Sequence, residues 1–257
     1  MSFKDIFNID AEVKESAHAR VNLIGEHTDY TGGYVMPTLL SFKNTIEISQ
    51  NNSNEFTVYS QHFKEKKSFN DLKKSTNNEW VDYIKGCLHI FFDENKISSR
   101  FLNIFISSDI PLERGISSSS ALCVATLKAL NTFFETKIND PEIAKLAKKV
   151  EFNYIGVSGG IMDQMVSSIG IHGKAFFMNC KNLEYELINF PENWKFCLID
   201  SEVQRNLRDS SYNERFAELQ EAEKKLGVEY LGEVKKENFQ INKFCLLYTS
   251  DAADEWW

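Results

Sequence analysis

The residues best suited to chemistry are concentrated in residues 19–37, which read ARVNLIGEHTDYTGGYVMP. The first part of this segment carries polar or charged side chains at Arg20, Asn22, Glu26, His27, Asp29 and Tyr30. They flank an apolar run, Val21-Leu23-Ile24, that is typical of a buried strand. A strand that ends in a glycine and several charges usually delivers those charges to a site. A solvated turn after a core strand is the alternative interpretation.

A second candidate is the serine-rich turn that holds Gly115 and the four serines at 117–120. Residues 101–107 before it predict a strand, and the Ala- and Leu-rich residues 121–130 after it predict a buried helix. Such a turn offers free backbone N–H groups and the positive end of a helix dipole to a phosphate. Its hydroxyls can cap the helix, or contact phosphate and a bound Mg²⁺. Because apolar elements flank the serines, we do not expect a linker.

Two carboxylates near a glycine-rich turn form the third candidate. Residues 139–142, Asn-Asp-Pro-Glu, predict a helix start, and Glu151 is expected to close that helix. Gly156, Gly159 and Gly160 then lead to Asp163. On local grounds Asp163 could equally be a cap or turn residue.

The elements that must position these residues mix helices and short strands. Strands are predicted at residues 45–49, 56–60, 175–180 and 195–200, and residues 64–78 are predicted to be a solvated loop. Residues 80–92 predict a helix with an apolar stripe of Val81, Ile84, Leu88 and Phe91. Another helix follows residues 204–215 and is expected to stop at Gly227.

Composition bounds the class of protein. The chain has 257 residues, room for one large domain or two modest ones. A formal net charge of −8 argues against non-specific nucleic-acid binding and against a basic membrane-binding face. The five cysteines form no C-x-x-C pair, the histidines have no metal-ligand spacing, and no apolar run is long enough to span a membrane. We expect a reduced, cytoplasmic protein that is monomeric and contacts neither nucleic acid nor membrane.

Residues 19–30 closely resemble the signature G-R-x-N-[LIV]-I-G-[DE]-H-x-D-Y of galactokinases, which belong to the GHMP family of small-molecule kinases, with Ala19 in place of the glycine. In that family the segment forms part of the sugar pocket. The resemblance implies that galactose is bound by Glu26, His27, Thr28, Asp29, Gly160 and Tyr212. Tyr212 is included because residues 203–215 resemble a family segment whose tyrosine contacts the sugar; alone, it would be read as a packing residue.

The serine turn resembles the family's ATP-binding motif P-x-G-x-G-L-S-S-S-A. This resemblance implies that ATP phosphates face Glu113, Arg114, Gly115, Ile116, Ser117, Ser118 and Ser119. Glu113 replaces the first glycine, and its charge would repel phosphate unless Arg114 offsets it by pairing with phosphate. The segment that opens with Trp80 and Tyr83 resembles one that lies near the adenine, although both residues could instead belong to the core.

Residues 156–164 resemble the family's G-x-x-x-G-I-M-D-Q segment, whose aspartate is the catalytic carboxylate. Asp163 takes that role by resemblance, steadied by Arg20, and Ser119 with Glu151 would hold Mg²⁺. The implied reaction is ATP-dependent phosphorylation of the anomeric hydroxyl of galactose, governed by positioning and charge stabilisation more than by proton abstraction. Two alternatives stay open: a non-catalytic galactose- and ATP-binding sensor, and an N-acetylgalactosamine kinase.

The family resemblance also implies the fold class: α+β, with a ribosomal-protein-S5-like N-terminal domain and the start of a ferredoxin-like second domain. We place the sugar- and ATP-binding domain at residues 1–190 and the incomplete second domain at 191–244. Residues 245–257 resemble a translated sequencing adaptor and are expected to be a non-native tail. A domain cut short would leave sheet edges unpaired, so we expect poor solubility and no activity of the 257-residue chain.

Overall fold

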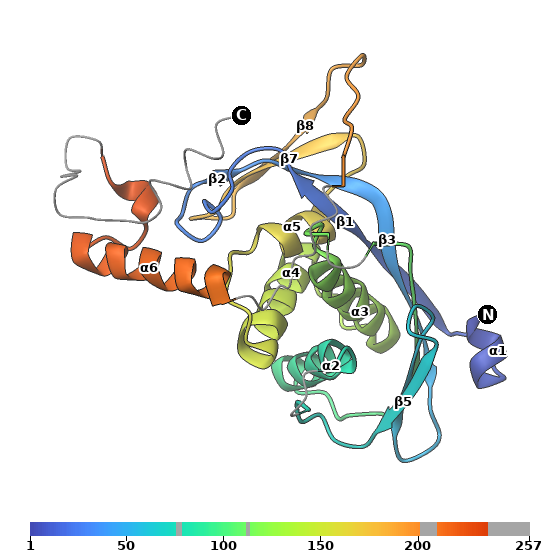
Figure 1. Ribbon diagram of the computed structural model, residues 1–257. Helices are drawn as coiled ribbons and strands as arrows, with labels where there is room; N and C mark the ends of the chain where they lie inside the picture. The colour runs from blue at the N-terminus through green and yellow to red at the C-terminus, as the bar shows by residue number, and fades with distance from the viewer. Residues whose placement is uncertain (76–78, 112–113, 201–209, 236–257) are drawn as a thin grey trace.

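The computed structural model describes residues 1–75, 79–111, 114–200 and 210–235, with only the backbone for residues 210–213. It confirms the predicted α+β class: a curved, mixed sheet has a layer of helices against its concave side (Figure 1). Among the predicted residues, Glu113, residues 245–257 and the side chain of Tyr212 lie outside the described part. The boundaries at 190 and 244 stay predictions.

The sheet has eight strands, in the path order β2-β7-β3-β6-β4-β5, with β1 added to β3 and β8 added to β7. Most neighbours are antiparallel, and β4 and β6 are parallel. The strands are β1 (Val13–Asn22), β2 (Tyr34–Val35), β3 (Pro37–Gln50), β4 (Phe56–Ser60), β5 (Glu65–Phe69), β6 (Leu102–Ser108), β7 (Lys174–Asn179) and β8 (Tyr185–Asn189).

Helices α2 to α5 pack together beside the sheet, whereas α1 and α6 lie at opposite ends of the molecule (Figure 1). The helices are α1 (Phe3–Phe7), α2 (Val81–Asn95), α3 (Ser118–Phe134), α4 (Asp140–Lys149), the π-helix η1 (Val150–Ile155), α5 (Met162–Ile169), α6 (Ser210–Leu226) and the 3₁₀-helix η2 (Leu231–Glu233). In the part of the chain that the structure describes, no helix is long and apolar enough to cross a membrane.

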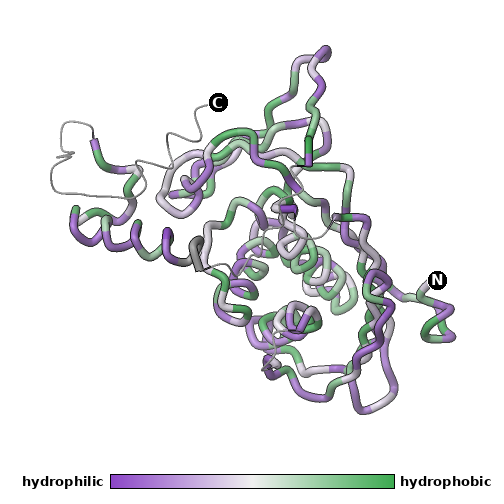
Figure 2. The backbone as a smooth tube through the Cα atoms, in the orientation of Figure 1, coloured by the Kyte–Doolittle hydropathy of each residue, from purple (hydrophilic) through white to green (hydrophobic). Residues whose placement is uncertain are grey.

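The main core lies between the helices and the middle of the sheet. Ile46 and Ile48 on β3 stand opposite Ile106 and Ile104 on β6, and all four are buried. The predicted stripe of α2 belongs to the same core, and its four residues are 0–2% exposed. Figure 2 shows hydrophobic residues on the helices that pack together beside the sheet. Burial of these side chains, each favourable by roughly 1.5–3 kcal/mol, fixes β3, and β1, which carries the first candidate motif, pairs with β3.

Several predicted elements are confirmed. Residues 80–92 lie in α2 apart from Trp80, which precedes it, residues 101–107 correspond to β6, and residues 121–130 form the buried middle of α3. Asn139 caps α4 by accepting a hydrogen bond from the backbone N–H of Glu142 at 2.9 Å. The last predicted helix ends before Gly227, which has a φ of +67°.

Four predictions about elements are wrong. Val21, Leu23 and Ile24 are not buried, and Ile24 is 66% exposed; the inward residues of β1 are Ala17 and Ala19. Residues 195–200 form no strand, because within the described part no neighbouring strand pairs with them. Residues 64–75 are mostly exposed, as predicted, but they are not all loop, because they contain β5, which pairs with β4 and so extends the sheet edge. Glu151 does not end its helix, because α4 runs directly into η1.

Candidate active site

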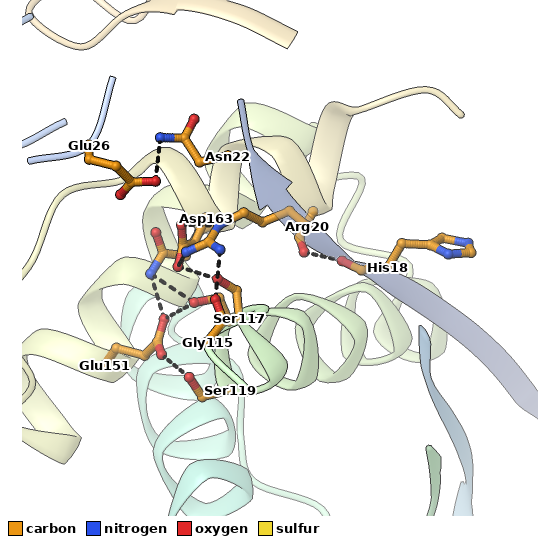
Figure 3. Close-up of polar contacts among 12 residues, drawn as sticks. His18, Arg20, Asn22, Glu26, Gly115, Ser117, Ser119, Glu151 and Asp163 are labelled. Carbon is orange, nitrogen blue, oxygen red and sulfur yellow. Dashed lines mark hydrogen bonds and ion pairs between the residues drawn. The ribbon is translucent and has the colours of Figure 1, made fainter. Parts of the chain in front are cut away.

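Arg20 and Asp163 form a two-pronged ion pair at the centre of the site (Figure 3). Arg20 Nε lies 2.7 Å from Asp163 Oδ1, and Arg20 Nη2 lies 2.7 Å from Oδ2. Arg20 extends from the end of β1 and Asp163 from the first turn of α5, so two distant segments meet. The side chains are only 14% and 25% exposed, and paired hydrogen bonds of this kind fix the carboxylate plane as well as its position.

The serine turn joins this pair at the start of α3. Arg20 Nη1 donates to the Gly115 carbonyl at 3.0 Å, and the Arg20 backbone N–H donates to the Ile116 carbonyl at 3.2 Å. Ser117 has a φ of +61°, and its hydroxyl donates to Asp163 Oδ2 instead of capping the helix. A left-handed conformation is unfavourable for a residue with a Cβ, so the turn holds Ser117 against its preference. Asp163 therefore lies beside the positive end of α3.

A second carboxylate, Glu151, lies on the other side of that helix end. Ser119 Oγ donates to Glu151 Oε1 at 2.7 Å (Figure 3). Ser120 Oγ donates to Oε2 at 2.8 Å, and Gln164 Nε2 also donates to Oε2. Burial raises the pKa of Glu151, and these hydrogen bonds partly offset that effect. Glu151 lies on η1, and π-helical turns are frequent at functional sites.

The loop after β1 brings Asp29 to the same region. A Cβ built on Gly160 would lie 2.0 Å from Asp29 Oδ2, so the glycine leaves room for that carboxylate. Burial, and next the charge of Asp163, raise the pKa of Asp29 to about 7. Gly25 has a φ of +101°, and a Cβ there would lie 2.4 Å from the Tyr34 carbonyl oxygen. The loop is thus held close to β2 and turned toward the Arg20–Asp163 pair.

The other predicted sugar ligands occupy this loop in different ways. The Thr28 hydroxyl lies 2.7 Å from the carbonyl oxygens of both Gly25 and Tyr34, where it braces the loop. His27 has a φ of +61° and its Nδ1 contacts the Tyr30 hydroxyl. Glu26 is exposed and accepts from Asn22 Nδ2 at 3.0 Å.

Tyr30 connects the loop with α6, since its ring packs edge-on against Phe216 with centroids 5.2 Å apart. The start of α6, where the chain carries Tyr212, therefore lies close to the loop.

The residues predicted to face the nucleotide have varied surroundings. Trp80 stacks on Phe63 and donates from Nε1 to Glu65 at 2.8 Å, and both Trp80 and Tyr83 pack against the main core. Arg114 Nε lies 2.9 Å from Asp200 Oδ2, while Arg114 Nη1 is buried without a hydrogen-bond partner among the described residues. The roles of these residues toward a nucleotide stay predictions.

Both Ser120 and Gln164 donate to Glu151; the sequence analysis included Ser120 in the serine turn without a role of its own, and it missed Gln164. Gln164 directly follows Asp163, and its polar side chain stands among the buried residues Met162, Met165 and Val166 of α5. A buried amide in an apolar helix face needs a polar partner, and that requirement is the signal that could have identified it.

Comparison with known proteins gives consistent results. The family described as the GHMP kinases N terminal domain matches residues 82–170, and the galactokinase galactose-binding signature matches residues 1–50. The chain is 35% identical over 229 residues to a galactokinase of Thermotoga petrophila, covering 89% of this chain and 64% of the relative. It is 34% identical over 248 residues to the galactokinase of Thermococcus kodakarensis, covering 88% of this chain and 69% of that protein.

Comparison with solved structures also points to galactokinases. The crystal structure of Lactococcus lactis galactokinase complexed with galactose superposes with a TM-score of 0.83 at 30% identity, covering 91% of this chain and 63% of that chain. The mevalonate kinase of Methanococcus jannaschii shares the fold, with a TM-score of 0.59 at 23% identity over 69% of this chain and 55% of that chain. This chain thus spans slightly less than two thirds of several of the proteins that it matches. On the identity and coverage of these relatives, it belongs to the galactokinase family.

Proposed function

We propose that this protein transfers the γ-phosphoryl group of ATP to the anomeric hydroxyl of galactose. The arrangement of Arg20, Asp163 and Ser117 beside the start of α3 is the observation that carries the proposal. It puts an oriented carboxylate next to a helix end whose N–H groups and dipole favour phosphate. Phosphoryl transfer depends mainly on such positioning and on charge stabilisation.

In the proposed reaction the hydroxyl oxygen of the sugar forms a bond to the γ-phosphorus as the bond between that phosphorus and ADP breaks. Asp163 orients the hydroxyl and accepts its proton. Arg20 holds both oxygens of Asp163 and keeps positive charge near the transferring group. The start of α3 receives the phosphates, with Ser117 to Ser119 lining it.

The proposed sugar side is the loop that carries Glu26, His27 and Asp29, closed by Gly160 and by the start of α6. Asp29 supports this assignment because its carboxyl lies against a glycine and within the field of Asp163. The structure of the Lactococcus lactis relative was solved with galactose bound, which makes galactose the sugar to test first.

The oxygen donors of the site are of the kind that binds Mg²⁺. Ser119 Oγ and Glu151 Oε1 are hard oxygen donors 2.7 Å apart. Hard oxygen donors of this kind are the ligands that Mg²⁺ takes in proteins, together with water and substrate phosphates. We assign these two residues to the ion, which would neutralise charge on the phosphates of ATP. Cytoplasmic location and a monomeric state stay predictions of the sequence.

The test is ADP release by the full-length protein in the presence of ATP, Mg²⁺ and galactose, with glucose as the control sugar. We expect the wild type to turn over galactose. Asp163→Ala should lose turnover but keep some sugar binding. Galactose binding without turnover would replace the proposal with a sensor function. Faster turnover with N-acetylgalactosamine would reassign the substrate.

A further inference from the structure

The hydrogen bonds to Glu151 are distributed unevenly between its two oxygens. Oε2 receives two donors, from Ser120 and Gln164, whereas Oε1 receives one, from Ser119. Glu151 is 7% exposed, and among the described residues no lysine or arginine forms an ion pair with it. A buried carboxylate without a cation is costly, so hydrogen bonds alone stabilise its charge here.

The orientation of Gln164 follows from this environment. Its amide nitrogen points at Glu151 Oε2 and lies 3.4 Å from Ser120 Oγ, so each of its two hydrogens has an acceptor. The amide oxygen is buried and has no hydrogen-bond partner among the described residues. Reversing the amide would place its oxygen against the carboxylate and lose the hydrogen bond to Glu151 Oε2. The amide nitrogen of Gln164 thus donates to Glu151 while its amide oxygen stays unpaired. Buried polar atoms in native proteins usually have a hydrogen-bond partner.

Ser120 completes the arrangement. Its hydroxyl donates to Glu151 Oε2 and lies within reach of the Gln164 amide, so the three side chains form a closed set. Ser120 is on α3, Gln164 on α5 and Glu151 on η1, and the set therefore joins three elements. Oε2 is saturated by protein donors, and Oε1, on the Ser119 side, keeps a lone pair available.

We propose that Gln164 and Ser120 are positioning residues that occupy Glu151 Oε2, so that Oε1 alone is presented to a divalent cation together with Ser119. The inference rests on the proposed ATP-dependent function. It predicts that the ion contacts Glu151 through one oxygen, and that loss of either positioning residue weakens metal binding without removing a metal ligand. Such outer partners typically change metal affinity by about 10- to 100-fold.

The experiment measures Mn²⁺ binding to the full-length protein in the presence of AMP-PNP and without sugar, by the electron paramagnetic resonance signal of free Mn²⁺. Gln164→Met keeps the volume but removes both donors, and Ser120→Ala removes one. We expect the Kd for Mn²⁺ to rise about tenfold or more in Gln164→Met and less in Ser120→Ala. In turnover, the Mg²⁺ concentration for half-maximal rate should rise likewise, with kcat at saturating Mg²⁺ nearly unchanged.

Ser168→Ala is the matched control. Ser168 is buried on the same helix and donates to the Asp140 carbonyl at 2.8 Å, away from Glu151. It should lower the melting temperature but leave the Kd for Mn²⁺ unchanged.

If Gln164→Met and Ser120→Ala both bind Mn²⁺ as the wild type does, the inference is wrong. If the wild type binds Mn²⁺ and AMP-PNP but does not phosphorylate galactose, the proposed function fails and the inference survives. If the wild type binds no Mn²⁺ with AMP-PNP, both fail.

Discussion

Gly160 and Asp29 lie so close together that no side chain fits between them, since a Cβ on Gly160 would be 2.0 Å from Asp29 Oδ2 and 2.3 Å from its Cγ. The glycine that precedes α5 therefore sets the position of a carboxylate on the loop after β1. Contact between these segments defines one wall of the proposed sugar site.

Gly160→Ala should displace Asp29 and weaken galactose binding. Overpacking of this kind costs about 1–3 kcal/mol, and 1.4 kcal/mol corresponds to tenfold in affinity. We expect the Kd for galactose, measured calorimetrically, to rise about tenfold or more. Gly173→Ala is the control: its φ of +77° makes alanine strained, but nothing lies within 4 Å of a Cβ there. An equal loss of affinity in both variants would refute the steric argument.

Asp29 makes the stability of the protein depend on pH. Its pKa is raised from 3.8 to about 7, primarily by burial, so between these pH values the folded protein binds a proton that the unfolded chain releases. The free energy of unfolding should therefore fall as the pH rises from about 4 to 7, by up to a few kcal/mol. Asp29→Asn should flatten this slope in urea unfolding between pH 5 and 7.5.

The control for that slope is Asp10→Asn, which changes an exposed carboxylate whose side chain is 79% exposed. It should leave the pH dependence of unfolding as in the wild type. A wild-type slope in Asp29→Asn would show that Asp29 is ionised in the folded protein at these pH values.

Arg20→Lys should reduce kcat far more than it changes galactose affinity. A lysine ammonium cannot contact both oxygens of Asp163 in one plane, so the carboxylate would lose its fixed orientation. Misplacement of a reacting group by about 1 Å can cost 10²-fold, and we expect a loss of kcat of that order in steady-state kinetics.

Lys128→Met is the comparison for Arg20→Lys. It breaks the 3.0 Å ion pair with Asp140 and the 2.7 Å hydrogen bond to the Ser168 carbonyl, so it should lower stability by about 1–3 kcal/mol while kcat stays intact. A normal kcat in Arg20→Lys would exclude a role of the paired geometry in turnover.

Ser117 combines a hydrogen bond with a strained backbone, and two variants separate these contributions. Ser117→Ala and Ser117→Gly both lose the hydrogen bond to Asp163, and each should lower kcat about tenfold. Only glycine relaxes the left-handed conformation, so Ser117→Gly should be about 1 kcal/mol more stable than Ser117→Ala. Equal melting temperatures for the two variants would show that the strain is absent.

Much of the fold follows from periodicity alone, because buried segments such as α2 and α3 carry apolar residues at helical spacing. Residues 195–200 mislead the same reasoning: an apolar run forms a strand only where a neighbouring strand offers hydrogen bonds. The π-helical turn at Glu151 was also missed, since no simple pattern distinguishes it from a continuing α-helix.

The types of the site residues could be predicted, but their pairing could not be derived from spacing. Arg20 and Asp163 are 143 positions apart, and only the fold brings them within 2.7 Å. Four serines in a row indicate more than a helix cap, and in the structure three of them, Ser117, Ser119 and Ser120, donate to two carboxylates. Gln164 was overlooked because its importance depends on a partner from another helix.

This division of the serines has a consequence for the length of the turn. Ser117 contacts Asp163, while Ser119 and Ser120 contact Glu151. The length of this short segment therefore fixes the distance between the two carboxylates. An inserted or deleted residue there would change that separation and misalign both carboxylates simultaneously. Natural variation should therefore alter the composition of this segment more readily than its number of residues.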